Sequence, residues 1–125
     1  MYEKQSKVIC NKKIINYKFK LDISKDDFNK YKKDLLIEFN KERKFYAIND
    51  LRYMNMMNIS YINYLLDINM IFTDEFIDKL GCTIIITNNK NKNIYNIIMR
   101  LSKTKVPYYI TTSLKDAIKY ILLLW

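Results

Sequence analysis

The chain has 125 residues, a length that suits one domain with a substantial hydrophobic core. Half of its residues are hydrophobic and 14% are aromatic, which argues against a disordered chain. Histidine is absent and glycine occurs once, which excludes His-based catalytic sites, most zinc sites and glycine-rich phosphate loops. We therefore expect one domain over residues 1–125 that is not an enzyme and holds no metal or cofactor.

The formal charge of +9 raises the question of nucleic acid or an anionic membrane as a partner. Only Arg43, Arg52 and Arg100 are arginines, so nearly all of the positive charge is carried by lysine. Lysine lacks the planar fork with which arginine grips phosphate or guanine, and the basic residues are spread along the chain. The pattern predicts a solvated, lysine-rich surface and argues against nucleic acid as the partner.

The two cysteines, Cys10 and Cys82, lie far apart in sequence and form no C-x-x-C pair. Together with the lack of a signal peptide, this favours two reduced thiols in a cytoplasmic protein. No apolar run approaches the length needed to cross a bilayer, so we expect no transmembrane segment.

The first third of the chain predicts a hairpin followed by a helix. "KVIC" (7–10) is a short strand candidate, and in "IINYKFKLD" a period of two predicts a strand that buries Ile15, Tyr17, Phe19 and Leu21. Ser24 begins a helix with acidic residues in its first turn, and the helix should end near Arg43. Its apolar stripe comprises Phe28, Tyr31, Leu35, Leu36 and Phe39.

The middle of the chain predicts a central strand and a long helical stretch. "KFYAIND" (44–50) is an apolar run that ends at Asp50, and an apolar stripe from about Ile59 to Leu80 follows at helical spacing. This stretch is one helix or two, because Thr73 could begin a new turn. Gly81 stands where a C-terminal helix glycine belongs.

The last third predicts two further strand and helix pairs. "CTIIIT" (82–87) is apolar on both faces, as in the middle of a parallel sheet. A helix capped by Asn88 or Asn89 follows, then the strand "VPYYI" (106–110), then a helix capped by Thr112 or Ser113. The expected buried faces of the two helices are Ile94, Ile97, Ile98 and Leu101, and Leu114, Ala117, Ile118, Ile121, Leu122 and Trp125.

The element order is therefore ββαβαβαβα. Alternating strands and helices predict an α/β domain with a single mixed, mostly parallel sheet of about five strands. Laid out in this order, the chain resembles the STAS or SpoIIAA-like superfamily, also labelled STAS/SEC14-like, and in particular small bacterial proteins of that fold without a settled function. The resemblance covers nearly the whole chain and is carried by "YAIND", "LGCTIIITNN" and "NIYNIIMRLSKTKVPYYITTSLKDAIKYIL".

The resemblance implies a regulatory role. Well-known members of the superfamily are switched by phosphorylation of a Ser or Thr in an Asp-Ser-Ser-Gly-like turn that begins a helix. The equivalent stretch here is 58–61, in which Ser60 keeps a hydroxyl while Asn58 and Tyr61 replace the aspartate and the glycine. Ser60 is thus the candidate phospho-switch, and the alternative is that it simply caps the following helix.

Polar residues follow three predicted parallel strands at their carboxyl ends, namely Asp50, Thr87 with Asn88, and Thr111. Ligands of open α/β sheets bind at that edge, so these side chains could line a shared crevice. The alternative is ordinary capping and loop formation.

The segment "RYMNMMN" (52–58) holds three methionines with few helix or strand signals. Flexible thioethers suit adaptable binding surfaces, although they could equally fill the core beneath a loop. The candidate partner contacts are Met54, Met56, Met57, Asn58 and Tyr61.

The sequence thus predicts a non-enzymatic STAS-like regulatory module that binds a protein partner or a small ligand, and it leaves homo-oligomerisation open. The alternative is a lysine-rich binder of nucleic acid or anionic lipid.

Overall fold

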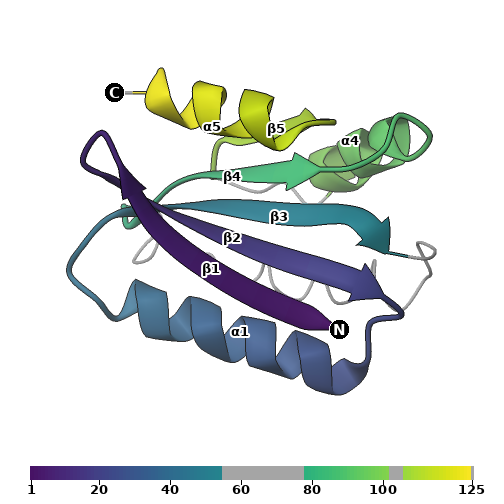
Figure 1. The fold of residues 1–125 in the computed structure, drawn as a ribbon, viewed down its shortest axis with the longest axis horizontal. Coiled ribbons are helices and arrows are strands. Elements are labelled where there is room, and N and C mark those ends of the chain that lie inside the picture. Colours follow the sequence, from purple (N-terminus) through teal and green to yellow (C-terminus); the bar gives the residue numbers. More distant parts are fainter. Residues whose placement is uncertain (55–77, 102–105, 125) are drawn as a thin grey trace.

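The structure is a computed structural model, and it describes residues 1–54, 78–101 and 106–124. These residues form a five-stranded sheet in the order β1-β2-β3-β4-β5, flanked by helices (Figure 1). β1 runs antiparallel to β2, and the remaining neighbours pair in parallel. The expected α/β class with a mixed, mostly parallel sheet is confirmed. The elements are β1 (Tyr2–Ile9), β2 (Lys12–Leu21), α1 (Lys25–Phe39), β3 (Phe45–Met54), β4 (Leu80–Ile86), α4 (Lys92–Leu101), β5 (Tyr108–Thr111) and α5 (Leu114–Leu122).

Helices lie on both faces of the sheet. In Figure 1, α1 lies along one side of the strands and α5 along the other. The first apolar cluster joins α1 and α4 to one face of the sheet, and Tyr31, Leu35, Tyr95 and Ile98 belong to it. The second joins α5 to the opposite face through Ala117 and Ile121, which pack with Ile48, Ile84 and Ile86. Because the central strands are covered on both faces, their sequences are nearly continuous apolar runs.

Aromatic rings fill the space between α1 and the β1–β2 hairpin. Tyr17 and Phe19 meet the ring of Tyr31 edge-on, with centroids 5.0 and 5.1 Å apart, and Tyr2 stacks on Tyr17 at 6.4 Å. Such pairs add about 0.5–1.5 kcal/mol each beyond the area they bury. Ser24 caps α1 as predicted: its Oγ accepts a hydrogen bond from the Asp27 N–H while the Asp27 carboxylate accepts one from Ser24 N–H.

Several boundaries differ from the sequence prediction. The first strand begins at Tyr2, and the turn is made by Cys10 and Asn11, whose φ angles of 49° and 65° fit a two-residue hairpin turn. α1 ends at Phe39 and not near Arg43. β3 continues past Asp50 to Met54, because it stays paired with β2 to the end of that strand.

Gly81 was wrongly predicted to end a helix. Leu80 and Gly81 open β4, and Gly81 has no positive φ. A Cβ at Gly81 would lie 2.3 Å from Cε1 of Tyr46, so the close approach of that ring is what requires glycine. The stretch 59–77 of the predicted helix lies outside the described residues.

Two predicted buried faces were also wrong in part. Leu21 is 57% exposed, because its φ of 57° turns the chain away at the end of β2. α4 buries Tyr95, Ile98 and Met99, whereas Ile94, Ile97 and Leu101 are exposed. The apolar residues form a wide arc on that helix, and only the part with Tyr95, Ile98 and Met99 meets the sheet, so the apolar pattern alone did not determine which part is buried. For α5, Ser113 is the cap: its Oγ accepts the Asp116 N–H at 3.1 Å.

Candidate functional site

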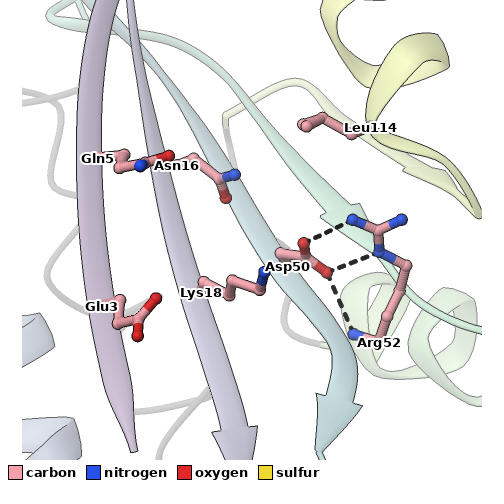
Figure 2. A pocket seen from close by; sticks show the side chains of 7 residues that line it. All are labelled: Glu3, Gln5, Asn16, Lys18, Asp50, Arg52 and Leu114. Carbon is pink, nitrogen blue, oxygen red and sulfur yellow. Dashed lines mark hydrogen bonds and ion pairs between the residues drawn. The ribbon is translucent and has the colours of Figure 1, made fainter.

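α5 covers its face of the sheet only in part, and a hollow remains over β1, β2 and β3 (Figure 2). Its volume is about 170 Å³. Pockets for drug-sized ligands and cofactors are larger, about 300–1,000 Å³. We call this feature the polar hollow; it is lined by Glu3, Gln5, Asn16, Lys18, Asp50, Arg52 and Leu114.

Strand register explains why these polar side chains meet. Glu3 pairs with Lys18 and Lys18 pairs with Asp50, so the three lie in one row across β1, β2 and β3. Gln5 pairs with Asn16 in the next row on the same face. Residues in register on neighbouring strands share a face, so the polar positions of the strands converge on one surface.

A β-bulge brings Arg52 into the hollow. Between the Lys18–Asp50 and Lys20–Tyr53 pairs, β2 advances by two residues and β3 by three. The extra residue breaks the strict alternation of β3 and re-aims a side chain, a common role of bulges beside functional sites. Arg52 turns back over the sheet, as Figure 2 shows, and its backbone N–H also donates to Asp50 Oδ1 at 3.2 Å.

The Asp50 carboxylate is 1% exposed and is neutralised by Arg52. Arg52 Nη2 donates to Oδ2 at 2.8 Å and Nε donates to Oδ1 at 3.0 Å, a two-point grip that only arginine can make. The hydrogen bond to Asp50 also raises the pKa of Arg52. With both carboxylate oxygens engaged, Asp50 is poorly placed to act as a general base.

Asn16, which lines the hollow, has an unused acceptor. Its Oδ1 is buried and has no hydrogen-bond partner among the described residues. A buried polar atom without a partner costs about 1–3 kcal/mol, so a donor on a bound molecule would relieve that cost. Lys18 adds a cation whose Nζ lies 4.4 Å above the centre of the Tyr53 ring. Together the two side chains suit a small ligand with a hydrogen-bond donor and an anionic group.

Of the predicted crevice residues, Asp50 lines the polar hollow. β4 separates it from Thr111, since Asp50 pairs with Ile86 and Ile86 with Thr111. The Thr87 N–H donates to the Thr111 carbonyl at 2.9 Å, and Thr87 Oγ1 is buried with no partner among the described residues. Asn88 is exposed and accepts the Asn91 N–H at 3.0 Å in the turn before α4. A shared crevice remains a prediction.

The predicted partner contacts lie largely outside the described residues, which include only Met54 of that group. Met54 ends β3, pairs with Leu21 and packs against the core cluster beneath α1, which is the alternative role considered above. Met56, Met57, Asn58, Ser60 and Tyr61 lie in the stretch 55–77, and the structure says nothing about them.

Sequence reasoning missed most of the polar hollow. The period of two in residues 14–22 leaves Asn16 and Lys18 on the exposed face of the predicted strand, and Arg52 falls in a segment with few helix or strand signals. The available signal was the alternation of β2, which already placed Asn16 and Lys18 on one face. The bulge that directs Arg52 back to Asp50 has no comparable signature in the sequence.

Many of the basic side chains are engaged within the fold. Lys4, Lys13 and Lys41 approach the buried Glu38 carboxylate at 3.4, 2.8 and 3.0 Å. Others donate to backbone carbonyls: Lys12 to those of Ile121 and Leu124 at the end of α5, and Lys79 to that of Phe39 at the end of α1. These contacts reduce the charge available to a polyanion.

Among the described residues there is no group of three or more acidic, cysteine or histidine side chains that could hold a metal ion. Nor does that part of the chain contain a helix of the length and apolarity needed to traverse a bilayer.

Neither the protein-family models nor the curated proteins include a match to this chain. Among solved structures, the chain is similar to an uncharacterised protein of the DUF3478 family with a SpoIIAA-like fold from Shewanella loihica PV-4. The TM-score is 0.72 at 10% sequence identity, and the match covers 95% of this chain and 92% of the other. The expected SpoIIAA-like fold is therefore confirmed, for a small protein whose structural counterpart has no known function.

Proposed function

We propose that this SpoIIAA-like domain is a non-enzymatic regulatory module and that the polar hollow is where it binds a small ligand. The observation that carries the proposal is the Oδ1 of Asn16, which has no hydrogen-bond partner in the described part of the chain, close to Lys18 and the Asp50–Arg52 pair. A ligand of this site carries a carboxylate or phosphate for the cations and an N–H or O–H for Asn16.

The character of the side chains favours binding over chemistry. Asp50 is held by Arg52, and Lys18 lies over the aromatic ring of Tyr53, so neither is well placed to act as a base or a nucleophile. The sequence has no histidine to take that role. A regulatory role would follow if the bound ligand changed the affinity of this surface for a protein partner.

A cytoplasmic location fits the state of the thiols. Cys10 and Cys82 are both free, one exposed and one buried, which suits a reducing compartment. The lysine-rich alternative, binding of nucleic acid or anionic lipid, is less well supported because the lysines named above already contact Glu38 or backbone carbonyls.

The proposal is tested by thermal-shift screening against small amino acids, hydroxy acids and dicarboxylic acids. A ligand of the hollow should raise the melting temperature of the wild type and have a smaller effect on Asn16→Ala and Lys18→Ala. Lys90→Ala is the matched control, since Lys90 is an exposed residue in the turn before α4. An equal shift in all four proteins would place binding elsewhere.

A further inference from the structure

The outer edge of β1 is free to pair with another strand. β1 is the first strand in the sheet order, and within the described parts of the chain only β2 pairs with it. Its residues 3–8 are exposed, so its outward N–H and C=O groups face solvent. Such an edge is a template for pairing with a further chain.

The hydrogen-bond pattern shows which residues point outward. Met1 and Lys20 exchange backbone hydrogen bonds of 2.8 and 2.9 Å, so Met1 faces β2. Backbone direction alternates along a strand, and the odd-numbered residues of β1 therefore bond to β2. The even-numbered residues, Tyr2, Lys4, Ser6 and Val8, direct their N–H and C=O groups to the free edge.

We infer that β1 pairs antiparallel with β1 of a second copy of this chain, with Gln5 opposite Gln5 of that copy. Two identical antiparallel strands must place one residue opposite itself, since only then do the outward backbone groups of both copies face each other. With Gln5 at the centre, Lys4 lies opposite Ser6 and Glu3 lies opposite Lys7 of the second copy. The strands then join through about four hydrogen-bonded residue pairs.

The charges on β1 select this register. A centre at Lys4 or Lys7 would oppose two like charges, which is destabilising. A centre at Ser6 would place Glu3 opposite Ile9 and form no ion pair. Only the Gln5 register sets Glu3 against Lys7 at both ends of the pairing, so the charges on this edge favour one partner in one alignment.

The paired strands would bring the two binding surfaces together. Glu3 and Gln5 line the polar hollow, as Figure 2 shows, and the two-fold axis of an antiparallel strand pair stands perpendicular to the sheet. Both hollows therefore open on the same face, and Gln5 of each copy lies at the junction. This inference does not depend on a ligand occupying the hollow.

Sedimentation equilibrium across the micromolar range tests the inference. The wild type should be a dissociating dimer. Lys7→Glu and Glu3→Lys each oppose like charges at two symmetric positions, and each should weaken dimerisation by about tenfold or more. The double variant carrying both changes should restore it. A monomeric wild type, or a double variant no better than the single ones, would overturn the inference.

A second variant tests the backbone pairing itself. Ser6→Pro removes an outward N–H and leaves the hydrogen bonds to β2 in place, so the monomer should fold while dimerisation is lost. Ser6→Ala is the control and should dimerise as the wild type does. Circular dichroism and thermal melting establish that both variants are folded. A folded Ser6→Pro variant that still dimerises would also contradict the inference.

Discussion

Arg52 holds the carboxylate of Asp50, two residues before it on the same strand, through hydrogen bonds of 2.8 and 3.0 Å. The side chain of Asp50 is 1% exposed and that of Arg52 is 27% exposed, so the anion is buried while its partner reaches water. The pair keeps a charge inside the domain that would otherwise be costly to bury.

Arg52→Ala should therefore destabilise the protein. Losing one partner of a fully buried pair costs about 3–5 kcal/mol, and we expect roughly 2–3 kcal/mol here because Arg52 is partly solvated. Urea denaturation measures the loss. Adding Asp50→Asn to Arg52→Ala should recover part of the stability, because the uncompensated charge is then gone. A loss below about 0.5 kcal/mol, the level of ordinary surface changes, would show that the pair is unimportant for the fold.

Glu38 gives the stability a defined pH dependence. Burial alone would raise the pKa of Glu38, but the hydrogen bonds and charges of Lys13 and Lys41 outweigh burial and lower the pKa below its ordinary value of 4.5. The charged form thus stabilises the fold fully above about pH 4.5, and this contribution is lost as the pH falls through the lowered pKa of the folded state.

We expect Glu38→Gln to be less stable than the wild type by roughly 1–3 kcal/mol at neutral pH, with the gap closing in acid. Urea denaturation at pH values from neutral down to acid measures this difference. Glu42→Gln, at an exposed position shortly after the end of α1, is the control and should track the wild type. A Glu38→Gln gap that stays constant with pH would contradict the role of the charge.

Gly81→Ala tests the close contact that replaced the predicted helix cap. A Cβ at this position meets the Tyr46 ring at 2.3 Å, so the ring or the strand must move, at a cost of about 1–3 kcal/mol. Thermal or urea denaturation measures this. Tyr46→Leu should offset part of that cost in the double variant, and purely additive losses would mean that the two residues do not compete for space.

The two thiols should differ in reactivity. Cys10 is exposed in the hairpin turn, whereas Cys82 is fully buried in β4, where burial raises its pKa to about 12. A thiol reagent such as DTNB should label only Cys10 in the native protein and should reach Cys82 after unfolding in urea. Cys10→Ser should show no fast labelling. Rapid reaction of native Cys82 would contradict its place in the core.

The sequence correctly predicted the elements whose apolar periodicity fits only one buried face. β2 alternates cleanly, so Ile15, Tyr17 and Phe19 were correctly assigned to the core. The prediction for α4 was wrong in part because its apolar arc is wider than the face that meets the sheet. The prediction for Gly81 was wrong because glycine suits both a helix end and a close tertiary contact. The local sequence pattern cannot show which part of a helix is buried or which role a glycine has, since both depend on what packs against the element.

Of the residues that line the polar hollow, only Asp50 was predicted as a site residue. Its burial at the carboxyl half of a central strand follows from the apolar run before it. Its partner, Arg52, reaches it because of the β-bulge in β3. That bulge depends on how β3 pairs with β2, which is a property of the assembled sheet. The importance of Asn16 also appears only in the assembled sheet, where its side-chain oxygen is buried without a partner among the residues that the structure describes.

Mapping a ligand by NMR tests the central claim most directly, that the polar hollow is the binding surface of this domain. The ¹⁵N-labelled wild type would be titrated with the small acids that shift its melting temperature. The account predicts the largest chemical-shift changes at the side-chain amide of Asn16 and at the backbone amides of Lys18 and Arg52, with loss of the response in Asn16→Ala. Changes confined to α4 or to the β4–α4 turn would contradict it.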